Sequence, residues 1–310
     1  MRIAVTGATG MIGRTLIAAV RDRGDDAVAL TRSPDGAHRV LGGDVELHAW
    51  PEPKQAPPPQ AALSGADAVV HLLGEPVAQR WSDEAKREIR DSRVLTTRWL
   101  VQGLAELPDD RRPATLVCQS ASGYYGSRGA EPLSEDTPGD ASGDDFLADV
   151  TAAWEHEALA ATALSGVRVV RTRTGVVLSP SGGALAKMLP PFRLGLGGPV
   201  AGGRQYVPWV HLEDVVGALL HCLDDRRAGG PVNVSAPNPA TNAELSRALG
   251  RVLHRPAVLP VPGVALRLLY GEMASMVLTG QRALPERLIE LGYAFRHPEL
   301  EQALRDVLTG

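Results

Sequence analysis

The first thirteen residues constrain the fold more than any other stretch of this chain. Residues 3–5 form a short apolar run typical of a strand buried in a parallel sheet. Gly7, Gly10 and Gly13 follow, and residues 14–23 then have the apolar spacing of a helix. This order is the context in which a glycine motif binds a dinucleotide, because glycine leaves the N–H groups at the positive end of the helix open to a pyrophosphate. The motif predicts a nucleotide cofactor; the alternative is a glycine-rich turn without a ligand.

The residue at the end of the second predicted strand distinguishes between two cofactors. An acid at this place accepts hydrogen bonds from the ribose hydroxyls of NAD, whereas an arginine accommodates the 2′-phosphate of NADP. The strand and its turn span residues 26–33, and the residue in question is Arg32. Arg14 could add a second positive charge, and a solvated loop arginine is the alternative for Arg32. We therefore predict NADP in preference to NAD.

Strands and helices alternate along the chain, which predicts an α/β fold with a doubly wound parallel sheet of the Rossmann type. We expect further strands at residues 44–50, 67–74, 115–119, 167–172 and 232–234, and further helices at 82–107, 146–164, 215–223 and 245–253. Ser82 and Asp214 are expected N-caps, and Thr241 with Glu244 has capping-box spacing. The predicted cofactor-binding residues are Gly7, Thr9, Gly10, Met11, Ile12, Gly13, Arg32, Leu72 and Gly74.

The same pattern predicts how the chain is divided. Residues 1–235 should form the NAD(P)-binding domain, with substrate-side insertions at about 176–205, where many glycines interrupt an irregular pattern. Residues 236–310 should form a smaller, mainly helical C-terminal region over the carboxyl edge of the sheet. Its role is not assigned by the sequence.

Composition and charge exclude several kinds of partner. The formal net charge of −4 leaves no basic footprint, so we expect no nucleic acid. The two cysteines, Cys118 and Cys222, lie in apolar surroundings and suggest a reducing compartment. The chain opens on a strand and has no apolar run of membrane-spanning length, so we expect a cytoplasmic protein without a membrane partner. The helix at 82–107 could pair two copies in a homodimer.

Several segments together resemble one known family. They are TGATGMIG, RWSDEAKREIRDSR, SASGYYG, DDFLADVTAAWE, RTGVVLSPSGGALAKMLPPFRLGLGGP and QYVPWVHLEDV, in this order. They are similar to the atypical extended short-chain dehydrogenase/reductases, in the sugar-nucleotide epimerase-like "epimerase family protein" group. Members of this group carry a short C-terminal domain of unassigned function, which residues 258–305 resemble. The resemblance covers nearly the whole chain.

The resemblance also implies a catalytic pair that this chain lacks. Active extended reductases use Tyr-x-x-x-Lys, in which the lysine lowers the pKa of the tyrosine so that its phenol exchanges a proton during hydride transfer. Here that place falls on Phe146 and Val150, or on Leu147 and Thr151.

Catalytic groups of a parallel sheet lie beyond the carboxyl ends of its strands. The hydroxyl groups that follow the strand predicted at 115–119 should therefore lie near the reaction centre. Ser120 or Ser122 matches the family hydroxyl that contacts substrate, and Tyr124 could replace the missing acid; turn-capping serines and a packed tyrosine are the alternatives. Weaker candidates are His211, Lys187, Arg80 and Trp81.

Two functions follow from these observations. The first is an NADP-binding, epimerase-like oxidoreductase acting on a small hydroxylated or carbonyl substrate, which could be a nucleotide sugar. The second is a catalytically silent NADP-binding sensor or interaction protein, which the missing Tyr/Lys pair supports.

Overall fold

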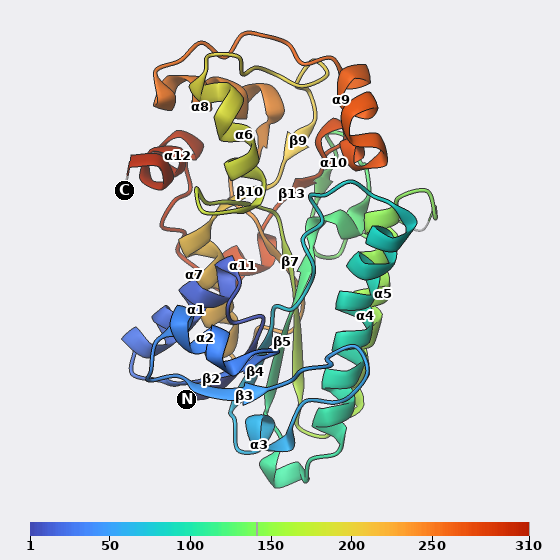
Figure 1. Ribbon diagram of the computed structural model, residues 1–310, viewed down its shortest axis with the longest axis vertical. Helices are drawn as coiled ribbons and strands as arrows, with labels where there is room; N and C mark the ends of the chain where they lie inside the picture. The colour runs from blue at the N-terminus through green and yellow to red at the C-terminus, as the bar shows by residue number, and fades with distance from the viewer. Residues whose placement is uncertain (141, 310) are drawn as a thin grey trace.

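A single parallel sheet organises the fold. Within the described residues, 1–140 and 142–309, the computed structural model has seven strands in the order β3-β2-β1-β4-β5-β7-β11 (Figure 1). All neighbours in this sheet are parallel. The strands are β1 (Arg2–Thr6), β2 (Asp26–Thr31), β3 (Glu46–Ala49), β4 (Ala68–His71), β5 (Thr115–Ala121), β7 (Arg168–Thr174) and β11 (Gly230–Val234). The order reverses between β1 and β4, so the predicted doubly wound sheet is confirmed.

Helices cover both faces of this sheet. On one face lie α1 (Met11–Asp22), α2 (Pro34–Leu41) and α7 (Leu212–Asp224); on the other lie α3 (Gln60–Leu63), α4 (Asp83–Ala105) and α5 (Phe146–Leu159) (Figure 1). Successive residues of β1 point to opposite faces: Ile3 and Val5 pack in the first core and Ala4 in the second. Because both faces are buried, the central strands β1, β2 and β4 are mostly apolar.

A third core forms the cap beyond the carboxyl edge of the sheet. It combines β8 (Val176–Leu178), α6 (Gly183–Arg193) and β10 (Trp209–His211) with α8 (Asn242–Leu253) and α12 (Leu300–Thr309). Leu189 and Trp209 from the earlier segment pack with Leu249 and Leu304 from the later one. The cap is therefore built from two separate stretches of chain.

Helix α6 lies in the region that we expected to be irregular. Its glycine-rich start and its two internal prolines, Pro190 and Pro191, obscured the helical pattern. The remaining elements of the cap are β9 (Tyr206–Val207), β12 (Ala240–Thr241), α9 (Gly263–Tyr270) and α10 (Ser275–Leu278), whereas α11 (Glu286–Glu290) packs on the main sheet, with Leu288 in the first core. In addition, β13 (Arg282–Ala283) pairs with β6 (Pro132–Leu133).

The helix caps agree with the sequence in two places and differ in a third. Ser82 caps α4, and Thr241 and Glu244 form the capping box of α8, as predicted. At α7 the cap is His211, whose Nδ1 accepts the backbone N–H of Glu213, so the prediction of Asp214 was wrong.

Asp214 instead anchors the C-terminal segment. Its buried carboxylate accepts the phenol O–H of Tyr293 at 3.0 Å. It also accepts the backbone N–H groups of Arg296 at 2.8 Å and His297 at 2.9 Å. Nearby, the amide of Asn233 donates to the carbonyl of Leu284, so the last strand of the sheet also holds the C-terminal segment.

A buried ion pair joins α5 to the sheet. Glu155 accepts from the guanidinium of Arg173 at 2.8 Å and 3.0 Å, from Arg171 at 2.6 Å and from the hydroxyl of Ser120 at 2.7 Å. Burial opposes the charge of Arg173, but the hydrogen bonds to Glu155 outweigh it and raise the pKa of the guanidinium. Glu155 thus ties α5 to both β5 and β7.

Replacing Glu155 with alanine should lower the free energy of unfolding by about 3–5 kcal/mol, because the buried charge of Arg173 would lose its partner. Urea unfolding followed by circular dichroism measures this loss. The matched control is Glu157→Ala on the same helix, whose partner Arg98 is 55% exposed. That variant should lose less than about 1 kcal/mol, and equal losses for the two variants would contradict the assignment.

Candidate functional site

The glycine loop lies where the strand order reverses, between β1 and β4. Gly7 has a positive φ of 67°, and a Cβ there would lie 2.8 Å from the carbonyl carbon and oxygen of Leu72. A Cβ at Gly13 would lie 2.3 Å from the carbonyl oxygen of Gly7. No side chain fits at either place, so these two glycines bring the start of α1 close to the ends of both strands.

A pocket of about 470 Å³ opens beside this loop. Six of the predicted cofactor residues line it: Gly7, Thr9, Gly10, Arg32, Leu72 and Gly74. The other three, Met11, Ile12 and Gly13, form the first turn of α1 and are not among its lining residues. The pocket lies at the topological switch point, where open α/β sheets bind their ligands.

Two basic side chains, Arg32 and Lys54, line this pocket together with two acidic ones, Glu75 and Glu88. Arg32 is exposed at the end of β2 and makes no hydrogen bond or ion pair to the described residues. Lys54 also lines the pocket, held by Glu88 at 2.7 Å. Arg14 is exposed but does not line the pocket.

Sequence reasoning missed several lining residues, among them Ser33, Lys54 and Glu88. We expected residues 51–59 to be only an exposed loop, yet Lys54 reaches the pocket from it. One feature of the sequence could have indicated the role of Lys54. Its loop follows the carboxyl end of β3, which lies next to β2, and ligands bind at that edge of the sheet.

His71 supports the loop from beneath, through a chain of hydrogen bonds. The N–H of Leu72 donates to Thr6 Oγ1, and that hydroxyl lies 2.7 Å from His71 Nδ1. On the other side His71 Nε2 lies 3.0 Å from Thr97 Oγ1, which itself donates to the carbonyl of Arg93. These donor and acceptor roles fit together when the His71 ring is neutral and carries its proton on Nε2. Thr96 and Thr97 are therefore buried beside His71 rather than facing the pocket.

The neutral state of His71 should make folding sensitive to acid. Burial lowers the pKa of His71 to about 3, whereas an unfolded histidine titrates near about 6.5. The unfolded chain therefore binds an extra proton as the pH falls below the unfolded value, and stability is lost by up to about 1.4 kcal/mol per pH unit.

His71→Gln should flatten this dependence, measured as the free energy of urea unfolding between about pH 7 and pH 4.5. His156→Gln, at an exposed position on α5, is the control and should keep the wild-type slope. An unchanged slope in His71→Gln would show that His71 does not titrate in this way.

The predicted catalytic residues lie together after β5, but they differ in what they contact. Ser120 is buried and donates to Glu155, so its hydroxyl is already engaged. Ser122 is buried and its hydroxyl makes no hydrogen bond within the described part of the chain. The ring of Tyr124 lies 3.5 Å from the guanidinium carbon of Arg173. This contact favours a packing role for Tyr124.

Two residues of α5 face the turn that follows β5. A Cβ at Gly123 would lie 3.7 Å from Leu147 Cβ and 3.8 Å from Thr151 Oγ1. Leu147 and Thr151, rather than Phe146 and Val150, are therefore the pair facing the loop. Neither side chain can act as a proton carrier in the way a phenol or an amine does.

The weaker candidates have structural contacts. His211 caps α7, Lys187 of α6 donates to the carbonyl of Ala78, and Trp81 packs edge-on against Phe146 at 5.1 Å. Arg80 is exposed. The Lys187 contact brings α6 against the loop that follows β4.

Two family models match the chain. The model described as "NAD dependent epimerase/dehydratase family" matches residues 3–235. A second model, "Domain of unknown function (DUF1731)", matches residues 261–307.

Relatives are similar over nearly the full length. The chain is 39% identical to "Epimerase family protein SDR39U1 homolog, chloroplastic" of Arabidopsis thaliana, covering 99% of this chain and 87% of that one. It is 36% identical to human "Epimerase family protein SDR39U1", covering 100% of both.

Two solved structures support the same grouping. Human SDR39U1, crystallised with NADPH, superposes with a TM-score of 0.86 at 35% identity, covering 100% of both chains. A nucleoside-diphosphate sugar epimerase from Corynebacterium glutamicum has a TM-score of 0.76 at 31% identity, covering 99% of this chain and 58% of that longer one. The chain thus belongs to the NAD-dependent epimerase/dehydratase family, in its group of SDR39U1-like epimerase family proteins with a C-terminal DUF1731 domain.

Proposed function

We propose that the protein binds NADP(H) in the pocket beside Gly7 and acts as an epimerase-like oxidoreductase on a small hydroxylated or carbonyl substrate. The observation that carries the cofactor assignment is Arg32, whose guanidinium has no partner among residues 1–140 and 142–309 and lies at the place where an acid would bind the ribose of NAD. The NADPH of the human SDR39U1 structure supports it. The name of the Corynebacterium relative supports a nucleotide sugar as the substrate class.

The residues around the pocket fit such a cofactor. Gly7 and Gly10 leave backbone exposed at the N-terminus of α1, where the helix dipole favours a pyrophosphate. Arg32 would hold the 2′-phosphate, and the nicotinamide would supply hydride transfer when bound. Ser122 offers a free hydroxyl to orient a substrate alcohol or carbonyl.

Arg32→Glu should weaken NADPH binding by about 10- to 100-fold, because it removes a charge-assisted hydrogen bond and adds repulsion. Binding of NADH, which has no 2′-phosphate, should change far less. Calorimetric titration with both nucleotides measures the difference. Arg226→Glu, an exposed arginine far from the pocket, is the matched control, and equal loss of both nucleotides in Arg32→Glu would contradict the 2′-phosphate assignment.

A second function, an NADP-binding sensor without catalysis, is favoured by the residues that follow β5 and by those of α5 that face them. Leu147 and Thr151, which face the turn after β5, carry neither a phenol nor an amine, Ser120 is bound to Glu155, and Tyr124 packs against Arg173. In such a protein the dinucleotide would stabilise one conformation of the chain.

Hydride transfer separates these two functions. The protein with bound NADP⁺ is mixed with nucleotide sugars and simple hydroxylated compounds, and the absorbance of the reduced nicotinamide is followed. An enzyme should form NADPH with a matching substrate, and Ser122→Ala should slow that step by about 10-fold or more, because it removes the hydroxyl that orients the substrate. Tight NADPH binding with no hydride transfer to any compound would favour the sensor.

Three further expectations stay predictions. They are the cytoplasmic location, the division of the chain near residue 235, and the homodimer through α4. The outward surface of α4 carries exposed arginines at 87, 90 and 98, so a dimer there would need complementary acidic groups.

A further inference from the structure

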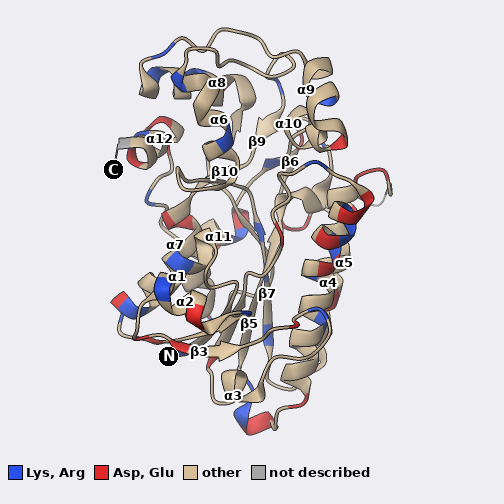
Figure 2. Cartoon of the chain, viewed as in Figure 1, with Lys and Arg blue, Asp and Glu red and all other residues tan. Residues whose placement is uncertain are grey.

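One end of the molecule differs in charge from the rest. Residues 183–212 contain Lys187, Arg193 and Arg204 but no Asp or Glu, and residues 245–271 contain four arginines and no acid. The whole chain has a net charge of −4, so positive charge is segregated at this end. Figure 2 shows it on α6, α8 and α9, at the top of the view.

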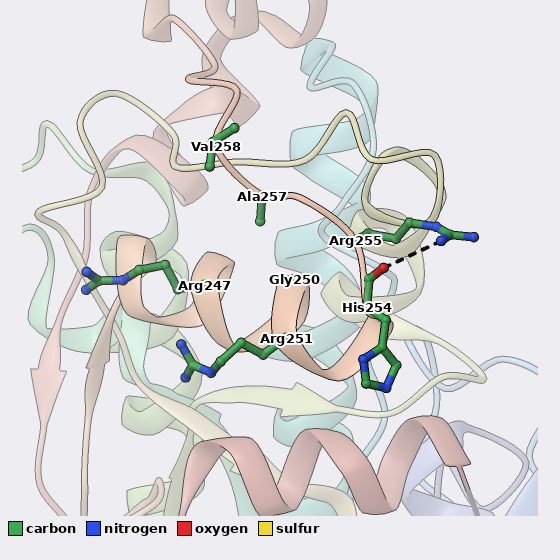
Figure 3. Close-up of a pocket in the computed structure, with 7 residues that line it drawn as sticks. All are labelled: Arg247, Gly250, Arg251, His254, Arg255, Ala257 and Val258. Atoms are coloured by element: carbon green, nitrogen blue, oxygen red, sulfur yellow. Dashed lines mark hydrogen bonds between the residues drawn. The ribbon is translucent and has the colours of Figure 1, made fainter.

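A shallow pocket of about 480 Å³ concentrates this charge (Figure 3). Arg247, Arg251, His254 and Arg255 line it, and Val258 lies at its rim. Arg247 makes no hydrogen bond to the described residues. Arg255 donates to the carbonyl of Arg193.

Two carboxylates lie close to these arginines, and both have other partners. Glu301 accepts from Arg251 and also from Arg305. Glu244 is bound by the backbone N–H and hydroxyl of Thr241. The pocket thus has three arginines, and the two carboxylates near them also bind other groups. It therefore keeps an excess of positive charge.

Apolar side chains are exposed beside this pocket. The loop after α6 and the loop before α9 run side by side, joined by the N–H of Leu259 to the carbonyl of Gly197 and by a bridge between Val200 and Val261. Leu194 on the first loop is 74% exposed and Val258 on the second is 75% exposed.

Helix α9 continues this apolar surface. None of its residues is buried, and Leu268 is 82% exposed, with Val264 and Leu269 also exposed. A helix of this length is marginal in water without packing on its apolar face. Within the described residues these side chains have no packing partner, and the two loops connect them to the arginine pocket along the same end of the molecule (Figure 1).

We propose that this end of the molecule binds the surface of an anionic phospholipid bilayer. The arginines would contact lipid phosphates, and the exposed leucines and valines would enter the boundary between headgroups and acyl chains. A second copy is a poorer partner, because a twofold contact would place arginines against arginines. No helix of the described residues is long and apolar enough to cross a membrane, so binding would be at the surface. The expectation from the sequence that the protein has no membrane partner was based only on membrane-spanning segments, and binding at a membrane surface needs none.

The test is sedimentation of the full-length protein with vesicles. We expect binding to phosphatidylcholine vesicles that contain phosphatidylglycerol, no binding to pure phosphatidylcholine, and release at high salt. Arg247→Glu should reduce partitioning by about fivefold or more, and the double variant Val258→Glu, Leu268→Glu should abolish it. Matched controls are Arg226→Glu and Leu159→Glu, exposed residues outside this end that should bind as the wild type does. Circular dichroism checks that each variant is folded.

Several results would overturn the proposal. One is no binding to anionic vesicles, or equal binding to neutral ones. Another is unchanged binding in the charge and apolar variants. Full displacement by soluble glycerol phosphate would indicate a site for free anions instead. A dimer in sedimentation velocity that Leu268→Glu dissociates would indicate a surface for a second copy.

Discussion

The contact between Glu155 and Arg173 is the interaction on which both halves of the molecule depend. Arg173 reaches from this pair to the phenol of Tyr125 at 3.0 Å, and that phenol donates to the side chain of Asn233 at 2.7 Å. Asn233 in turn holds the carbonyl of Leu284 at 2.9 Å. One buried polar network therefore runs from α5 across β7 and the edge strand β11 to the C-terminal segment, and every member of it has a partner.

This network explains why the two halves of the site differ. At the cofactor half, glycines and an unpaired arginine leave space and charge open to a ligand. At the reaction half, Ser120 and Tyr124 are committed to Glu155 and Arg173. The groups that would bind a dinucleotide thus stay accessible to a ligand. Most of the polar groups that could take part in catalysis are instead held in structural contacts.

Much of the fold followed from local patterns, and most of the errors came from non-local contacts. The spacing of Gly7, Gly10 and Gly13, and Arg32 at the end of a strand, are local signals, and the strand order follows from alternation. The reach of Lys54 into the pocket depends on how a loop folds back over the sheet. The capping of α7 was misassigned because Asp214 finds partners about eighty residues later. The partnership of Ser120 with Glu155 likewise joins two elements whose packing no local pattern reveals.

The anchoring of the C-terminal segment has a consequence for how this family can change. Asp214 and Asn233 belong to the stretch matched by the epimerase model, yet their partners lie in or next to the DUF1731 stretch. If the last stretch were exchanged for an unrelated one, the buried carboxylate of Asp214 would lose its partners Tyr293, Arg296 and His297, and the amide of Asn233 would lose the carbonyl of Leu284. Two different family models match the two stretches, yet each stretch needs the other in order to fold. Relatives that align with this chain from end to end are consistent with this dependence.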